Sequence, residues 1–243
     1  MNKYFYDLHI HSCLSPCAEN DMTPANIAGM ASICGLNIVA LTDHNTTKNC
    51  RAFFAAAKKY GIIPVAGMEM TTAEDVHMVV LFENLEDAER FDAEFQKYRV
   101  LYKNKTEIFG DQLIVDENDN VTGIEENLLI NASTLSISDA VTLLEGYGAA
   151  VFPAHIDREE NGIISMLGMI PESPFFPTVE LNDGSKKEEY IKKYSLTDRL
   201  TVTDSDAHHL WQINEAENFI MLDDEPYSSA LVRKNLIKLL RGK

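Results

Sequence analysis

The chain has 243 residues, of which 45% are hydrophobic, so it can bury one sizeable core, and single α/β barrels often have about this length. It carries 38 acidic and 21 basic residues, which gives a formal net charge of −17. Because a surface of this charge repels long polyanions and no basic stripe with interleaved aromatic residues is present, the composition predicts that long nucleic acid is not a partner.

The apolar runs of the chain are short. None is long enough to span a bilayer, and Asp7, His9 and His11 interrupt the only early stretch that could form a signal peptide. We therefore expect a soluble, cytoplasmic protein that does not bind membranes.

Strands and helices are expected to alternate along the chain. The first strand is expected at 4–10, and Thr23-Pro24 then begins a helix, with a capping residue and a proline in its first turn, that ends at Gly35. The other strands are expected at 37–41, 62–66, 77–82, 149–153, 178–181, 200–203 and 219–222. The other helices are expected at 47–60, 85–102, 138–147, 186–194 and 228–240. This alternation favours parallel strands with right-handed crossovers in one α/β domain over 1–243.

The segment at about 103–134 interrupts the alternation. Residues 112–116 and 121–125 flank a polar turn and predict a hairpin, so we expect a small inserted hairpin subdomain. The basic residues near its start are Lys97, Arg99, Lys103 and Lys105. They form either a solvated helix face or a surface that guides the substrate.

Two histidines lie at the end of the first expected strand. His9 and His11 are two residues apart, so on an extended strand both imidazoles face the same side. More histidines and carboxylates follow other short apolar runs, and the C-terminal ends of parallel barrel strands converge on one rim. Imidazole with carboxylate is a ligand mixture suited to Zn, Mn or Fe. The candidate metal ligands are His9, His11, His44, Glu69, His77, His155, Asp206 and His208.

His77 differs from the other candidates because it begins its expected strand. The segment from Glu69 turns through Thr72 to Asp75. If the next strand runs antiparallel, His77 returns to the same rim.

The four cysteines are expected to be reduced thiols in the cytoplasm. They are Cys13, Cys17, Cys34 and Cys50. Cys13 and Cys17 flank the loop that follows the first strand, where they either bind a metal or are structural or incidental thiols.

Five motifs stand in the order and spacing of a known family over nearly the whole chain. They are Asp7-Leu-His-Ile-His11-Ser, Leu41-Thr-Asp-His44-Asn, Gly67-Met-Glu69, Pro153-Ala-His155 and Ser205-Asp-Ala-His208. This arrangement resembles the PHP family, named for polymerase and histidinol phosphatase domains. The resemblance implies a distorted seven-stranded (β/α) barrel that binds two or three divalent transition metals and hydrolyses phosphate esters.

The resemblance also implies which residues share each metal. The first metal would be held by His9, His11, Glu69 and Asp206. The second would share Glu69 and add His77 and His155, and the third would use His44 and His208. Many family members complete the third site with an aspartate in the first loop, where this chain has Ser15-Pro16-Cys17, so Glu19 and Asp21 are the candidate substitutes.

Three further residues are expected to take part in catalysis. Arg158 follows His155 by three residues and is the candidate for a bidentate phosphate clamp, unless it forms a surface ion pair with Glu159 or Glu160. His208, or His44, would protonate the leaving oxygen if the third metal is absent. Asp43 is expected to orient an imidazole from behind.

We therefore expect a metal-dependent phosphoesterase that hydrolyses a phosphate monoester of a small metabolite or nucleotide through a metal-bridged hydroxide. One alternative is a barrel amidohydrolase, although the bridging lysine usual there has no counterpart after a strand between Ala66 and His155. The other is a non-catalytic metal-binding module, although such modules usually lose ligands that this chain keeps. The expected partner is a small phosphorylated substrate, and the oligomeric state is not predicted.

Overall fold

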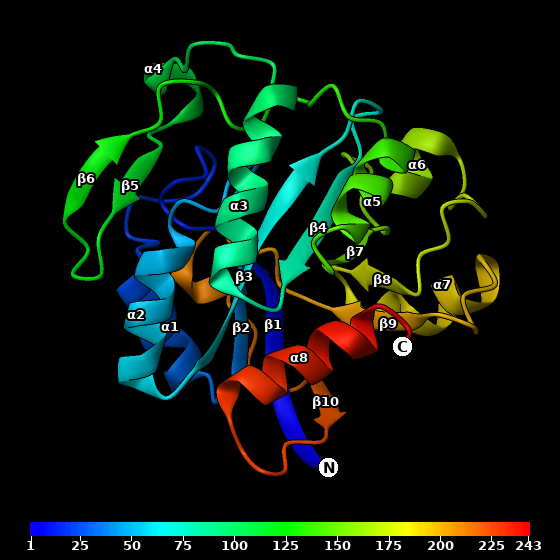
Figure 1. Ribbon diagram of the computed structural model, residues 1–243. Coiled ribbons are helices and arrows are strands. Elements are labelled where there is room, and N and C mark those ends of the chain that lie inside the picture. The colour runs from blue at the N-terminus through cyan, green and yellow to red at the C-terminus, as the bar shows by residue number, and fades with distance from the viewer.

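The computed structural model describes residues 1–243 and has a twisted sheet at its centre (Figure 1). Its six strands lie in the order β10-β1-β2-β3-β4-β7. Their bounds are Phe219–Leu222 for β10, Asn2–Ile10 for β1, Ile38–Leu41 for β2, Ile63–Thr71 for β3, His77–Phe82 for β4 and Ala150–Pro153 for β7. β1, β2 and β3 are parallel, whereas β4 runs antiparallel to β3, with Thr71 opposite His77. This is the reversal expected for His77, which returns it to the end of the sheet where β3 ends.

Two further strands form a separate parallel pair, β8 (Thr178–Leu181) and β9 (Leu200–Thr203). After β9, a single parallel bridge joins Ala207 to Ile10 at the end of β1. Regular pairing stops there because Asp206 has a φ of 51°, in the left-handed region that no strand adopts. The fold is a mixed α/β fold with a curled half-barrel sheet, and the closed seven-stranded barrel implied by the resemblance is not confirmed.

Five helices of nine or more residues cover the sheet, and they are α1 (Pro24–Ile33), α2 (Cys50–Tyr60), α3 (Leu85–Phe95), α5 (Ile137–Glu145) and α8 (Ser229–Leu240). Thr23 caps α1 as expected, because its side chain accepts a hydrogen bond from the Asn26 amide and Pro24 occupies the first turn. Helix α3 is shorter than predicted, because a 3-10 turn follows at Gln96–Tyr98 and Arg99 is extended. No helix of the structure is both long and apolar enough to cross a membrane.

The short elements lie mainly near the rim of the sheet or in loops. They are α4 (Thr106–Phe109), α6 (Ile163–Leu167), α7 (Lys187–Lys193) and the 3-10 turns Gly184–Lys186 and Leu210–Gln212. Apolar side chains are buried in two clusters, one that includes Ile27, Phe53 and Phe91, and one that includes Val65, Phe152 and Leu236. The sheet is thus packed on its faces, and the loops at the end of β1 are left to build a site.

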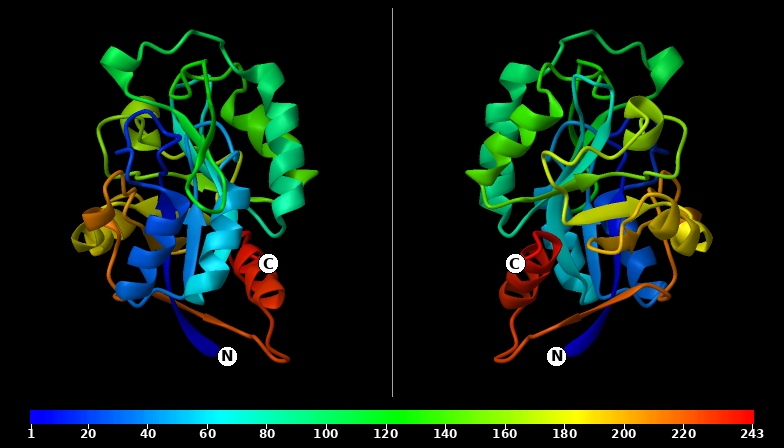
Figure 2. Two further views of the ribbon diagram at one scale, coloured as in Figure 1. Left: turned by 90° about the vertical axis from the view of Figure 1, so that its left-hand side faces the viewer. Right: turned by 90° about the vertical axis from the view of Figure 1, so that its right-hand side faces the viewer.

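The predicted hairpin consists of β5 (Leu113–Val115) and β6 (Val121–Ile124), which pair antiparallel. Figure 2 shows the segment around α4 arching over the loop that follows β1. The Leu113 amide donates to the Cys13 carbonyl at 2.8 Å, so the hairpin is attached to that loop, and an independent subdomain is not confirmed.

The four basic residues before the hairpin differ in their exposure to solvent. Lys97 pairs with Glu94 at 3.0 Å, whereas Arg99 is buried and donates to the side chain of Gln96 and the carbonyl of Asn127. Lys103 and Lys105 are exposed. Arg99 is therefore held inside the protein, whereas Lys97, Lys103 and Lys105 lie at the surface.

Candidate metal centre

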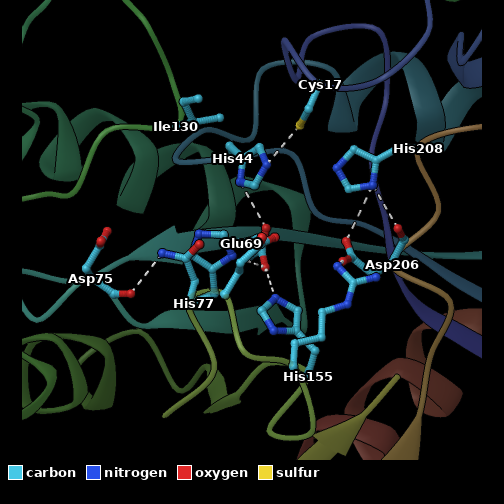
Figure 3. Close-up of a pocket in the computed structure, with 12 residues that line it drawn as sticks. Cys17, His44, Glu69, Asp75, His77, Ile130, His155, Asp206 and His208 are labelled. Carbon is cyan, nitrogen blue, oxygen red and sulfur yellow. Dashed lines mark hydrogen bonds and ion pairs between the residues drawn. The ribbon is translucent and has the colours of Figure 1, made fainter. Parts of the chain in front are cut away.

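Seven of the eight predicted ligands form three overlapping groups, in each of which the donor atoms lie within 4.8 Å of one another. The groups are His9, His11, Glu69 and Asp206; His44, Glu69 and His77; and His11, His44 and His208. The eighth ligand, His155, reaches Glu69 Oε1 through its Nε2 at 3.0 Å. Figure 3 shows Glu69 between His44, His77 and His155.

The first group is almost completely buried. The Nε2 atoms of His9 and His11 lie 3.2 Å apart, and the Asp206 Oδ1 atom lies 3.4 Å and 3.0 Å from them. These atoms come from the end of β1 and from the loop after β9, two segments far apart in the sequence. The period of two along a strand places both imidazoles on the same side, as predicted.

Glu69 is the carboxylate shared by the first and second groups. Its Oε1 lies 2.7 Å from His77 Nδ1, and its Oε2 lies 2.9 Å from His44 Nδ1. Against the expected division, His44 thus faces Glu69 and His77 with one nitrogen, and it also belongs to the group with His11 and His208.

Three of these close contacts lack hydrogen-bond geometry. His44 Nδ1, His77 Nδ1 and Asp206 Oδ1 are buried and make no hydrogen bond, although each lies within about 3 Å of another ligand atom. A buried polar atom without a partner costs about 1–3 kcal/mol. Cations between these atoms would satisfy all three, so the residues fit a centre of divalent metals.

Buried partners orient the two strand histidines. His9 Nδ1 donates to both carboxylate oxygens of Glu180 at 3.0 Å, and His11 Nδ1 lies 2.9 Å from Ser15 Oγ. Ser15 Oγ in turn donates to Asp43 at 2.8 Å. Both Nε2 atoms are left free to face the centre. The Asp43 carboxylate thus reaches His11 through Ser15, and its expected orienting role stays a prediction.

Glu180 is the site residue that the sequence reasoning missed. It lies in β8, is completely buried, and accepts a hydrogen bond from the His155 amide as well as from His9. The signal was a single carboxylate within the apolar run Thr178–Leu181. A buried charge in a strand needs a partner, and here the partner is His9, one of the candidate ligands.

Charges within the centre shift its pKa values strongly. Burial lowers the pKa of His9, but the carboxylates of Glu180, Asp206 and Glu69 outweigh it and raise that pKa well above its usual range. In the same way Asp206 and Glu69 raise the pKa of His11 to about 9 against burial. Burial favours the neutral form of Asp206, yet His9 and His11 lower its pKa far below the usual value. Without metal, these histidines and carboxylates stabilise one another's charged forms.

The pKa of His208 is shifted in the opposite direction, below its usual value. Burial, followed by the nearby His11, lowers the pKa of His208 to about 3. Its Nδ1 donates to the Asp206 carbonyl at 2.8 Å, which leaves Nε2 as a lone-pair donor. A neutral imidazole of this kind is suited to bind a metal, and it is a poor source of a proton at neutral pH.

The centre forms the floor of a cavity of about 480 Å³, a volume within the usual range for ligand sites. Arg158 lines this cavity and donates to Asp206 Oδ2 and, at 3.1 Å, to Asn182 Oδ1. The alternative pairing with Glu159 or Glu160 is not formed. The guanidinium therefore lies in the cavity beside Asp206, one of the candidate metal ligands.

The first loop does not supply the carboxylate that was expected for the third metal. Glu19 pairs with His209 at 2.9 Å, and Asp21 is exposed; neither belongs to a group of donors. The side chain that reaches His44 from this loop is Cys17, with its Sγ 3.2 Å from His44 Nε2.

The chain has a PHP-like fold, and the donor groups of its centre are suited to metal. Residues 7–118 match the family model of the PHP domain, which confirms the resemblance inferred from the motifs. A 5′-3′ exoribonuclease of Haemophilus influenzae is 30% identical over 112 residues, which are 44% of this chain and 39% of that protein.

Solved structures share the fold at low sequence identity. The lesion-specific endonuclease Q of Pyrococcus furiosus superposes with a TM-score of 0.68 and 17% identity, over 99% of this chain and 56% of that one. A protein named as a metal-dependent phosphoesterase, from Bifidobacterium adolescentis, has a TM-score of 0.59 and 18% identity, over 95% of both chains. The present chain thus spans little more than half of endonuclease Q.

These comparisons overturn the expectation that long nucleic acid is excluded and that the partner is a small phosphorylated molecule. Endonuclease Q has been solved with a 27-mer duplex that carries an abasic lesion, again with 99% of this chain and 58% of that one aligned at 18% identity and a TM-score of 0.66. The charge argument failed because it treated the whole net charge of −17 as surface charge. Six of the 38 acidic residues are buried in or beside the centre, namely Asp7, Asp43, Glu69, Glu180, Asp204 and Asp206. Metals bound there would reverse the local charge.

Proposed function

We propose that the protein is a metal-dependent phosphoesterase that cleaves phosphate esters of nucleic acid at a chain end. The observation that carries this proposal is the convergence of histidines and carboxylates around Glu69 on the floor of a cavity, with Arg158 beside them. The names of the exoribonuclease relative and of endonuclease Q support nucleic acid as the substrate class.

The shape of the site supports action at an end. The donors lie at the bottom of a cavity of about 480 Å³, which suits a terminal nucleotide better than the middle of a duplex. Asp75 and Glu160 also line the cavity, and they would repel a second stretch of backbone.

The residues of the site have three separate roles in this proposal. The predicted ligands would hold the metals, which supply an activated water and neutralise the charge on the phosphoryl oxygens. Glu180 and the Ser15–Asp43 pair keep the imidazoles of His9 and His11 in position. Arg158 would hold a phosphate oxygen through its fork of donors.

Neither alternative is favoured by the cavity. No lysine lines it, so the bridging lysine of a barrel amidohydrolase has no counterpart there. A non-catalytic module would not need a nearly complete set of donors along the lining of an open cavity.

The test is a comparison of substrates with the metal-reconstituted chain. We expect release of mononucleotides from one end of a 5′-phosphorylated single-stranded RNA or DNA, and loss of this release after chelation. Asp206→Asn should remove it, whereas Asp198→Asn, at a side chain that is 64% exposed, should not. Internal fragments would contradict action at an end, and a metal-loaded protein without activity on RNA, single-stranded DNA or an abasic duplex would contradict the proposal as a whole.

A further inference from the structure

We propose that Ile130 contacts the base of the terminal nucleotide, so that the site prefers a nucleoside phosphate to a sugar phosphate without a base. This inference rests on the proposed function, because it assigns one part of a terminal nucleotide to each side of the cavity. Arg158 would hold the phosphate, and Ile130 would pack against the base.

Ile130 gives the cavity its apolar part. Twelve residues line the cavity, and ten of them are polar or charged. The two others are Cys17 and Ile130, of which Ile130 has the aliphatic side chain. The preceding residues Leu128 and Leu129 are buried in the protein, whereas Ile130 is partly exposed. This side chain therefore favours a ligand with an apolar face, because covering it removes apolar surface from water.

The apolar part of the cavity is separate from the part that would bind phosphate. Arg158 pairs with Asp206, and in Figure 3 Ile130 lies beyond His44 as seen from Asp206. A nucleotide has the same division, with a charged phosphate at one end and a flat base at the other. The cavity volume of about 480 Å³ is in the range of sites that hold a ligand of this size. A nucleotide with its phosphate at Arg158 would thus direct its base toward Ile130.

The backbone on both sides of Ile130 is fixed by one buried side chain. Asn45 Nδ2 donates to the carbonyls of Leu129 and Asn131, at 2.6 Å and 3.0 Å. The Leu129 amide also donates to Gln112 Oε1, at 2.8 Å. Ile130 therefore lies in a turn whose position is set by hydrogen bonds and not by its own packing.

The same asparagine is joined to the candidate metal centre. Asn45 follows His44 directly, is 1% exposed, and has a left-handed φ of 53°, which asparagine tolerates better than most residues. Its Oδ1 accepts from the Thr71 amide at 2.9 Å, and its own amide donates to the Glu69 carbonyl at 2.9 Å. The inserted segment thus presents Ile130 at a fixed place relative to two candidate ligands, as a residue that determines specificity requires.

The test compares the binding of adenosine 5′-monophosphate and ribose 5-phosphate, which differ by the base alone. We expect the metal-loaded wild-type chain to bind the nucleotide about 10-fold more tightly in calorimetry. Ile130→Ala should remove this preference and leave the affinity for ribose 5-phosphate unchanged, because only the contact with the base is lost. Ile124→Ala, at a side chain of the same inserted segment that is 58% exposed and lies outside the cavity, should change neither affinity.

Two further variants guard against a misfolded protein. Ile130→Val and Ile130→Thr have side chains of nearly the same shape, and the first should keep most of the preference whereas the polar second should lose most of it. No measurable binding of the nucleotide, equal affinities of the wild-type chain for both probes, or a preference that persists in Ile130→Ala would overturn the proposal. The preference without cleavage of any nucleic acid would refute the proposed function and leave the contact with the base intact, whereas cleavage from an end without the preference would do the reverse.

Discussion

Glu180 accepts hydrogen bonds from His9 Nδ1 with both of its carboxylate oxygens, at 3.0 Å each. The two residues are 171 positions apart and are both completely buried. The carboxylate fixes the tautomer of His9 and makes its Nε2 a stronger donor to a metal.

Glu180→Gln should therefore weaken metal binding by about 10- to 100-fold, because the amide keeps the size of the side chain and loses its charge. Competition with a chromophoric chelator measures this affinity. Glu188→Gln, on the exposed surface of α7, is the matched control. Equal affinities of the two variants would show that Glu180 only fills space.

The wild-type chain should carry at least two transition-metal ions, because the donors form three groups, two of which share Glu69. His9→Ala and Asp206→Asn should each reduce the content and abolish hydrolysis, since both residues belong to the most deeply buried group. Elemental analysis after expression in metal-supplemented medium gives the count. Fewer than one ion per wild-type chain would rule out a multinuclear centre.

Arg158→Ala should lower kcat/KM by roughly 30- to 1000-fold, since a desolvated charge-assisted contact to phosphate contributes about 2–4 kcal/mol. Arg158→Lys keeps the charge without the fork and should recover only part of this loss. Because Arg158 also contacts Asp206, metal content is measured in parallel. Arg90→Ala, at a side chain that is 63% exposed, is the control. Unchanged kinetics would mean that Arg158 only forms an ion pair with Asp206 and does not contact the phosphate.

The metal-free protein should lose stability as the pH rises from 6.5 to about 9. His11 has a folded pKa of about 9 and an ordinary value of 6.5, and the pKa of His44 is raised to about 9 as well, against burial, by Cys17 and Glu69. A raised folded pKa stabilises the fold fully below pH 6.5, and this contribution disappears as the pH passes about 9.

Denaturant unfolding at both ends of this pH window measures the change. His77 and His208, whose pKa values are lowered, act in the opposite direction, but only below pH 6.5. Metal-loaded protein should show the reverse trend, because protons compete with the metal for the same nitrogens. A metal-free protein that is equally stable at pH 6.5 and pH 9 would contradict the charge arrangement described for His11.

The sequence predicted which candidate donors lie close together better than it predicted their surroundings. His9 and His11 follow from the period of a strand, and the place of His77 follows from one reversal of direction, so local rules were sufficient. Glu180 and the contact of Cys17 with His44 depend on segments that only the folded chain brings together. The net charge led to the wrong prediction that long nucleic acid is excluded. A sum over residues does not distinguish a buried carboxylate from an exposed one.

The gap in strand pairing between β9 and β1 has a consequence for the whole molecule. Side chains close this gap in place of a backbone ladder, with Asp204 accepting from the Leu8 amide at 2.6 Å and Asp7 accepting from the Ser205 amide at 3.1 Å. The donors His9 and Asp206 lie on opposite sides of it. An ion bound by both would act as a cross-link between the two sheets, in the way that a disulfide joins two segments of a secreted protein. Chelation should then loosen β8 and β9 before the six-stranded sheet, so that amide exchange in these two strands reports how firmly the centre is occupied.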